Sequence, residues 1–148
     1  MSPNKPSKIQ GDLSKDERGV VKFINNFKFE GIKRFYIVEN INTEIIRAFH
    51  GHMKEAKYVF VVSGSILLCT VFLDDKKNPS KENKVEKFVL KSNSPEILYI
   101  PPSFANGFRT LEEDTKVIFF STTTLEESLA DDYRFPSNYW GDRVWEDE

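Results

Sequence analysis

The sequence predicts an all-β fold, a barrel or a sandwich of short strands, on three observations. About eight short segments rich in β-branched and aromatic residues recur roughly every 8–12 residues, with turn residues between them. Aromatic residues make up 14% of the 148 residues, and 13 of them are phenylalanines, which favour strands. Helix-forming sequence is nearly absent until the acidic segment 125–132 near the end of the chain.

The first half of the chain alternates between strand and turn signals. Residues 1–15 read as a flexible N-terminal arm, because their beginning is polar and carries two prolines, and residues 16–148 read as a single domain. Segment 20–29 mixes apolar residues with Asn25-Asn26, which predicts a short strand followed by a turn. Strands are predicted over 33–38 and 44–52, on either side of turn residues.

The second half carries the strongest β signal. Segment 58–73 predicts two strands joined by a tight turn at Ser63-Gly64-Ser65, where glycine accepts positive φ without steric cost. A strand over 97–100 ends at Pro101-Pro102, because proline cannot donate to the ladder. Segment 125–132 predicts a short C-terminal helix. Further strands are predicted over 85–90, 107–111 and 116–121.

The charge balance and the cysteine count restrict the function. Charged residues make up 30% of the chain, but the net charge is only −2, whereas nucleic-acid binding usually needs a basic face. We therefore expect no nucleic-acid partner. We also expect no membrane partner, because no apolar stretch approaches the roughly 20 residues of a membrane span. A lone cysteine, Cys69, cannot form an internal disulfide, and we expect a cytoplasmic protein.

The two histidines of the chain, His50 and His52, lie two residues apart on a predicted strand. Side chains at i and i+2 point to the same face of a strand, so both imidazoles enter one space. A histidine pair can accept and donate protons near neutral pH. The alternative is a pair of structural or surface histidines.

Cationic side chains accompany the histidine pair. Arg47, Lys54 and Lys57 lie close to it in sequence, and Arg34 stands beside Tyr36 on the preceding strand. A guanidinium can bind a pyrophosphate through two parallel hydrogen bonds, and a buried lysine can stabilise a developing oxyanion. For any single cation the alternative is a solvated surface charge.

These segments together resemble a known family. The run 47–54, followed by 57–65, is similar to the core of the sugar-nucleotide cupins, which include dTDP-4-dehydrorhamnose 3,5-epimerases and dTDP-4-keto-6-deoxyglucose 3,4-ketoisomerases. The two histidines and the upstream Lys33-Arg34-Phe35-Tyr36 resemble the ketoisomerases. Segment 100–108 resembles the epimerases, although Asn106 replaces their histidine and residues 121–124 lack their catalytic tyrosine.

The resemblance implies a cupin-type jelly-roll β-barrel and, as substrate, a nucleotide-linked 4-keto-6-deoxyhexose with dTDP as the nucleotide. It implies a 3,4-ketoisomerase; the alternatives are a 3- or 5-epimerase and a non-catalytic sugar-nucleotide-binding cupin. The catalytic residues implied are His50, His52 and Lys57. The substrate-binding residues implied are Arg34, Tyr36, Arg47, Lys54 and Asn106.

The resemblance also implies that the protein needs no cofactor and pairs into a homodimer. Many cupins hold a metal with a His-x-His motif and a downstream glutamate. Glu55 could serve here, but it falls early, and Asn106 replaces the later histidine. Since a stable first-row metal site usually wants three or more good ligands, we expect no functional metal.

Overall fold

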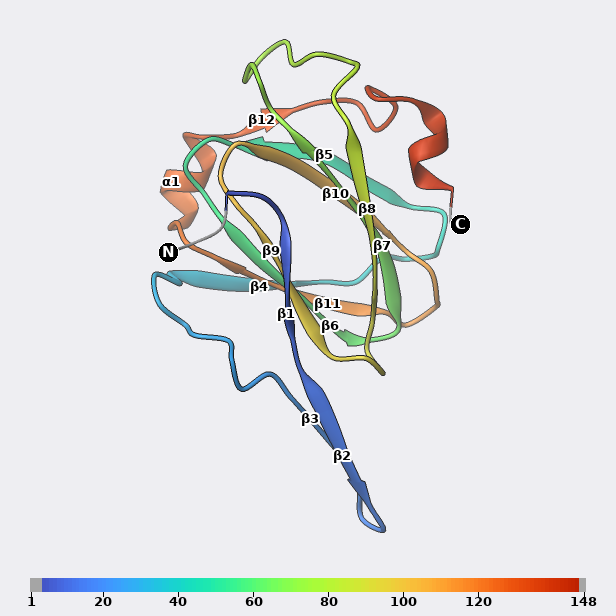
Figure 1. Cartoon of the computed structure of the whole chain (residues 1–148). Coiled ribbons are helices and arrows are strands. Elements are labelled where there is room, and N and C mark those ends of the chain that lie inside the picture. Colours follow the sequence, from blue (N-terminus) through green and yellow to red (C-terminus); the bar gives the residue numbers. More distant parts are fainter. Residues whose placement is uncertain (1–3, 147–148) are drawn as a thin grey trace.

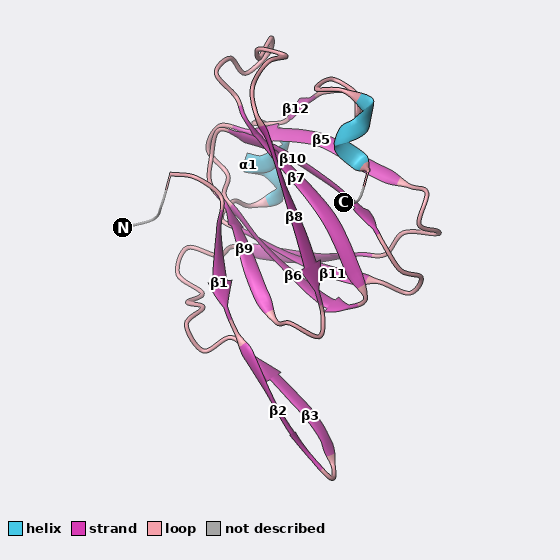
Figure 2. Ribbon diagram, turned by 45° about the vertical axis from the view of Figure 1, so that its right-hand side comes forward, coloured by secondary structure: helices cyan, strands magenta, loops and turns pink. Residues whose placement is uncertain are grey.

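The computed structural model describes residues 4–146 and confirms the all-β prediction. Two antiparallel five-stranded sheets face each other, and a separate hairpin extends from one end of the body (Figure 1, Figure 2). The first sheet has the order β1 (Ser7–Gln10), β9 (Glu96–Ile100), β6 (Lys57–Ser63), β11 (Lys116–Ser121) and β4 (Arg34–Val38). The second has the order β12 (Tyr133–Arg134), β5 (Ile46–His52), β10 (Phe104–Thr110), β7 (Ser65–Phe72) and β8 (Val85–Lys91).

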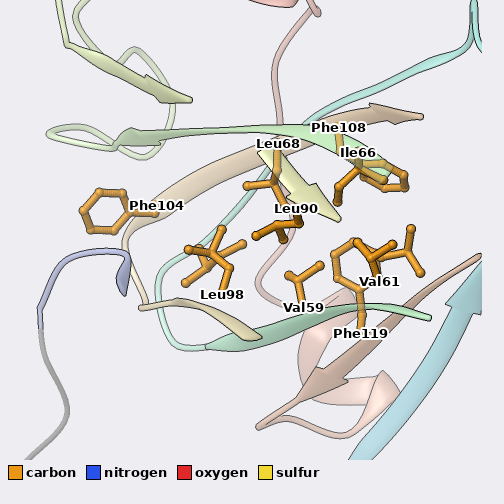
Figure 3. Close-up of a cluster of buried hydrophobic side chains, with 11 residues drawn as sticks. Val59, Val61, Ile66, Leu68, Leu90, Leu98, Phe104, Phe108 and Phe119 are labelled. Atoms are coloured by element: carbon orange, nitrogen blue, oxygen red, sulfur yellow. The ribbon is translucent and has the colours of Figure 1, made fainter. Parts of the chain in front are cut away.

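The main core fills the space between the two sheets (Figure 3). Alternate residues of β6, such as Val59 and Val61, point inward, because successive side chains of a strand point to opposite faces. They meet Leu68 of β7 and Leu90 of β8. Truncating one such buried aliphatic side chain to alanine typically costs about 2–5 kcal/mol of stability.

A second core covers the outer face of the second sheet. The C-terminal segment packs Phe135, Trp140 and Trp145 against that face, where they meet Phe49 of β5. Strand β7 is therefore buried on both faces, which explains why its sequence is a continuous apolar run. Cys69 lies in this cluster, and burial raises the pKa of its thiol to about 12.

The N-terminal region differs from the predicted flexible arm. Residues 7–10 form β1, which pairs with β9 at the edge of the first sheet. Residues 12–16 form β2 (Asp12–Asp16), which pairs with β3 (Gly19–Phe23) in the projecting hairpin, so the boundary expected between residues 15 and 16 falls inside a strand. Short polar strands at a sheet edge bury little, and so they carry no hydrophobic period in the sequence. Residues 1–3 of the predicted arm lie outside the described residues.

Most other elements agree with the sequence. The predicted C-terminal helix is α1 (Leu125–Leu129), which Thr124 and Glu127 start with a capping box. A single 3-10 turn, η1 (Asp142–Trp145), follows near the end. Strand β10 begins at Phe104 rather than at residue 107, so Asn106 lies on a strand and not in a loop. Among residues 4–146, no helix has the length and hydropathy to cross a membrane.

Candidate active site

Strand β5 delivers both histidines to the same side of the second sheet, as the spacing predicts. Asn106 of β10 stands opposite His50 in the register, and Phe104 stands opposite His52. The two rings line adjoining hollows of about 190 and 220 Å³. His50, Lys57 and Tyr36 line both, so the two hollows form one continuous site between the sheets.

The two hollows differ in what surrounds the shared residues. We name the first the Asn106 hollow; its other lining residues are Val38, Arg47, Asn106, Phe108 and Phe119. We name the second the Asp132 hollow; its other lining residues are Arg34, His52, Leu125, Ser128, Leu129, Asp132 and Arg134. Each is below the roughly 300 Å³ of a typical ligand pocket, so a sugar nucleotide would need both.

His50 is held as a neutral base. Burial is the main cause that lowers the pKa of His50 to about 4, and the positive charges of Lys57 and Arg134 add to it. Asp132 acts in the opposite direction, because its negative charge favours the imidazolium. At neutral pH the His50 ring is therefore uncharged and has a free lone pair for a substrate proton.

His52 is buried and oriented by a main-chain contact. Its Nδ1 lies 2.6 Å from the carbonyl oxygen of Asp131. Since a carbonyl only accepts, Nδ1 must carry the hydrogen, and the neutral ring then leaves the Nε2 lone pair for the hollow. Burial is the main cause that lowers the pKa of His52, with help from Lys57, while Glu55 raises it.

Lys57 brings a buried positive charge to the place where the hollows meet. It is the first residue of β6, and its Nζ lies 5.8 Å from the centre of the Phe119 ring. Within residues 4–146, no carboxylate lies close enough to this amine for a salt bridge. A desolvated ammonium beside two neutral imidazoles is suited to stabilising an oxyanion.

Arg34 and Tyr36 form one wall of the site. The guanidinium carbon of Arg34 lies 5.1 Å from the centre of the Tyr36 ring, and that ring stacks on Phe119 at 5.1 Å. Arg34 also places Nη2 3.5 Å from Oε2 of Glu55, so part of its charge faces the protein rather than the hollow.

Arg47 and Lys54 lie further from the histidine rings. Arg47 is exposed at the rim of the Asn106 hollow, where its Nε donates a hydrogen bond to Oδ1 of Asn40 at 2.6 Å. Lys54 does not join the site, because β5 ends at His52 and the chain turns away. It lines a separate hollow beside Met53 and Tyr133. The structure thus brings together seven of the eight predicted residues, with Lys54 outside.

The sequence does not predict the contribution of the C-terminal segment. Strand β12 pairs with β5, placing Tyr133 opposite Gly51 and Arg134 opposite His50. Asp132, whose carboxylate accepts a hydrogen bond of 2.9 Å from Nε of Arg134, therefore lines the hollow of the histidines. The one sequence signal for these residues is the pair Asp131-Asp132 near the end of the predicted helix. That pair does not indicate which strand the segment would pair with.

Across residues 4–146, no three His, Cys, Asp or Glu side chains gather closely enough to hold a metal ion. Glu55 lies on the Nδ1 side of His52, 3.6 Å away, and not beside His50. The arrangement therefore offers two imidazoles, an ammonium and a phenol for proton transfer and oxyanion stabilisation.

Comparisons with known proteins bear on this chemistry. A family model described as dTDP-4-dehydrorhamnose 3,5-epimerase matches residues 7–135. The spore coat polysaccharide biosynthesis protein SpsL of Bacillus subtilis (strain 168) is 27% identical over 105 residues, which are 70% of this chain and 63% of SpsL. The match therefore spans less than two thirds of that relative.

Solved structures share the fold. QdtA, a sugar 3,4-ketoisomerase from Thermoanaerobacterium thermosaccharolyticum solved in complex with TDP, superposes with a TM-score of 0.69 at 20% identity, covering 95% of this chain and 94% of QdtA. The rmlC epimerase of Mycobacterium tuberculosis gives a TM-score of 0.75 at 17% identity, covering 98% of this chain and 76% of the epimerase. The likeness confirms the predicted cupin-type jelly roll.

Proposed function

Because the chain belongs to the dTDP-4-dehydrorhamnose 3,5-epimerase family, we propose that it isomerises a nucleotide-linked 4-keto-6-deoxyhexose, with dTDP as the nucleotide, by moving the ketone from C4 to C3. The observation that carries this proposal is the pair of histidines, half-buried His50 and buried His52, that face one continuous site with Lys57. A 1,2-shift of a carbonyl needs two proton-handling groups, and this site has them on one strand.

The first half of the reaction is proton removal. His50, neutral at pH 7, takes the proton from C3 next to the ketone, and the electron pair left behind forms an enediolate with its charge on the C4 oxygen. Lys57 stabilises that charge as it develops. The apolar side chains of Phe108 and Phe119 limit water around the hollow and strengthen this interaction.

The second half is proton return. His52 takes the proton of the C3 hydroxyl and delivers it to C4, while the proton held by His50 goes to the C4 oxygen. C4 then becomes a secondary alcohol, C3 becomes the ketone, and both histidines return to the neutral form. The Nδ1 hydrogen bond to the Asp131 carbonyl supports this role, since it directs Nε2 to the hollow. The net change moves one carbonyl and needs no oxidant or reductant.

The diphosphate is assigned to the cations at the rim. Arg47 lies at the edge of the Asn106 hollow and Arg134 at the edge of the Asp132 hollow. Either guanidinium can bind phosphate oxygens bidentately. Arg34 and Tyr36 contribute the wall against which the sugar lies, and Asn106 supplies an amide that can hydrogen-bond a sugar hydroxyl.

A second candidate function is epimerisation at C3 or C5 through the same enolate. The observation that favours it is Tyr36, the phenol that lines both hollows. A phenol can return a proton to the opposite face of the sugar, which inverts the carbon and leaves the carbonyl where it was.

The test is incubation with dTDP-4-keto-6-deoxyglucose in deuterated water, followed by NMR. Deuterium at C4 with the ketone at C3 supports the ketoisomerase, whereas deuterium on an inverted C3 or C5 with the ketone at C4 supports the epimerase. Binding without any exchange would overturn both reactions and leave a sugar-nucleotide-binding protein. The variant His52→Asn should keep exchange at C3 but lose carbonyl movement.

We also propose that the protein acts as a cytoplasmic homodimer. Phe35 and Ile37 of edge strand β4 are 61% and 56% exposed, and they lie beside exposed Phe29 and the Phe120 ring. Apolar groups gathered in this way often mark an interface. Light scattering during gel filtration should give about twice the 17.2 kDa of one chain, and Ile37→Lys should give a monomer.

A further inference from the structure

Glu55 is a buried carboxylate that the reaction described above does not use. It lies three residues after His52, just before β6, and is only 2% exposed. Burying a carboxylate costs free energy unless its charge is matched and its oxygens are hydrogen-bonded. We therefore expect a neighbouring group whose positive charge is stabilised by the buried Glu55 carboxylate.

The two oxygens of Glu55 have different surroundings. Oε2 accepts a hydrogen bond of 2.7 Å from Oγ of Ser121 and lies 3.5 Å from Nη2 of Arg34. Oε1 lies 3.6 Å from Nδ1 of His52 and has no hydrogen-bond partner within 3.5 Å, but the Ser128 side chain is close enough to help lower the pKa of Glu55. One oxygen is thus anchored to the protein, and the other faces the imidazole.

Asp131 holds the His52 imidazole from the side opposite the hollow. Its carboxylate accepts hydrogen bonds from the backbone N–H groups of Met53 and Lys54, at 2.9 and 2.8 Å, while its main-chain oxygen meets Nδ1 of His52. Asp131 therefore holds the backbone that follows His52 next to its own carbonyl. If the His52 ring flipped so that Nδ1 faced the hollow, it would lose its contact with that carbonyl.

His50 has no equivalent arrangement. Asp132 is the carboxylate whose charge raises the pKa of His50, but it already accepts a hydrogen bond from Arg134 at the rim. Lys57 disfavours a proton on either ring, but at His52 the buried Glu55 charge opposes this effect, whereas at His50 the Arg134 charge adds to it. The two histidines therefore differ in how well they hold a proton.

We propose that Glu55 is a positioning residue that makes His52 the proton carrier of the site, by facing Nδ1 with a buried negative charge while Nε2 faces the substrate. The inference rests on the proposed function, because it assigns the order in which the two histidines act. His50 opens the reaction as the base, and His52 holds the proton during the carbonyl shift.

Several charged groups share this environment and belong in the test. Those that face or line the surroundings of His52 are His50, Glu55, Lys57, Arg34, Asp131, Asp132 and Arg134. Because Glu55→Gln preserves size and removes only the negative charge, it isolates the carboxylate from the rest. Ser121→Ala is the matched control, since it removes an anchor of Glu55 and leaves the charge in place.

The experiment is an NMR titration of the imidazole resonances in the free, folded protein. In the wild type, His52 should carry its hydrogen on Nδ1 and titrate at a higher pH than His50. In Glu55→Gln the His52 titration should move to lower pH, while Ser121→Ala should leave it nearly unchanged. An unchanged His52 titration in Glu55→Gln, or a His50 that titrates above His52 in the wild type, would overturn the proposal.

The kinetic readout separates this inference from the proposed function. Glu55→Gln should lower kcat for carbonyl movement by about 10-fold or more with KM within about 2-fold, while deuterium exchange at C3 continues. Loss of exchange and turnover together in the folded variant would contradict a role through His52. If the wild type fails to exchange at all, the proposed function fails, but the titration still tests the Glu55–His52 pair. If Glu55→Gln does not fold, the wild-type order of titration decides.

Discussion

The two halves of the active site use the same residue type for different purposes. The Asn106 hollow surrounds His50 with apolar side chains from both sheets, Phe108, Phe119 and Val38, and with the cations Arg47 and Lys57. The Asp132 hollow places His52 beside charged groups from the C-terminal segment. Two imidazoles two residues apart on one strand thus receive different environments, which is how proteins separate an acid from a base.

The largest expected effect comes from removing the base of the Asn106 hollow. His50→Asn should lower turnover by about 10³-fold or more and abolish deuterium exchange at C3, since general-base catalysis contributes roughly 10²–10⁴-fold. Turnover and NMR-detected exchange are measured on the same sample, and circular dichroism serves as the check on folding. Exchange at the wild-type rate would assign the first proton to another group.

Removing the charge that the two halves share should have the next largest effect. Lys57→Met should slow turnover by about 10²–10³-fold, as expected for loss of an oxyanion-stabilising donor. It should also raise the pKa of His50, because the Lys57 charge is one of the causes that lower it. Steady-state kinetics and an imidazole titration report the two effects. Lys57→Arg, which keeps the charge, should retain more of the activity.

The pH dependence should reveal the buried base directly. Because the pKa of His50 is lowered to about 4, kcat/KM for the free enzyme should stay nearly constant down to pH 5 and fall only near pH 4. Between pH 6.5 and about 4, the unfolded chain binds a proton that the folded chain does not, so stability to urea should decrease as the pH falls through this window. An activity limb centred near pH 6.5 would contradict the lowered pKa of His50.

The smallest effect should come from the predicted residue that lies outside both hollows. Lys54→Ala should change kcat and KM by less than about 2-fold, because Lys54 is exposed and lines a separate hollow. Arg47→Ala, at the rim, is the comparison and should raise KM. A large loss of activity in Lys54→Ala would show that the chain beyond β5 reaches the substrate.

The sequence predicts the centre of the molecule better than its ends. Strands β5 and β6 and the shared face of the two histidines follow from local patterns of alternation and from residue spacing. Asp132 and Arg134 could not be placed in the same way, because a pairing between β12 and β5 joins positions some 80 residues apart and leaves no local signal. Lys54 is predicted from its closeness in sequence to the histidines and from the family resemblance, but β5 ends at His52 and the backbone there turns toward Asp131.

The short β12 ladder has a consequence for biosynthesis. During translation the histidine strand leaves the ribosome before Asp131 and Asp132 exist, so the nascent chain still lacks β12, the second core and one wall of the catalytic centre. Proteolysis before Asp131 would have the same result. It would remove the carbonyl that orients His52 together with the aromatic side chains that cover the second sheet.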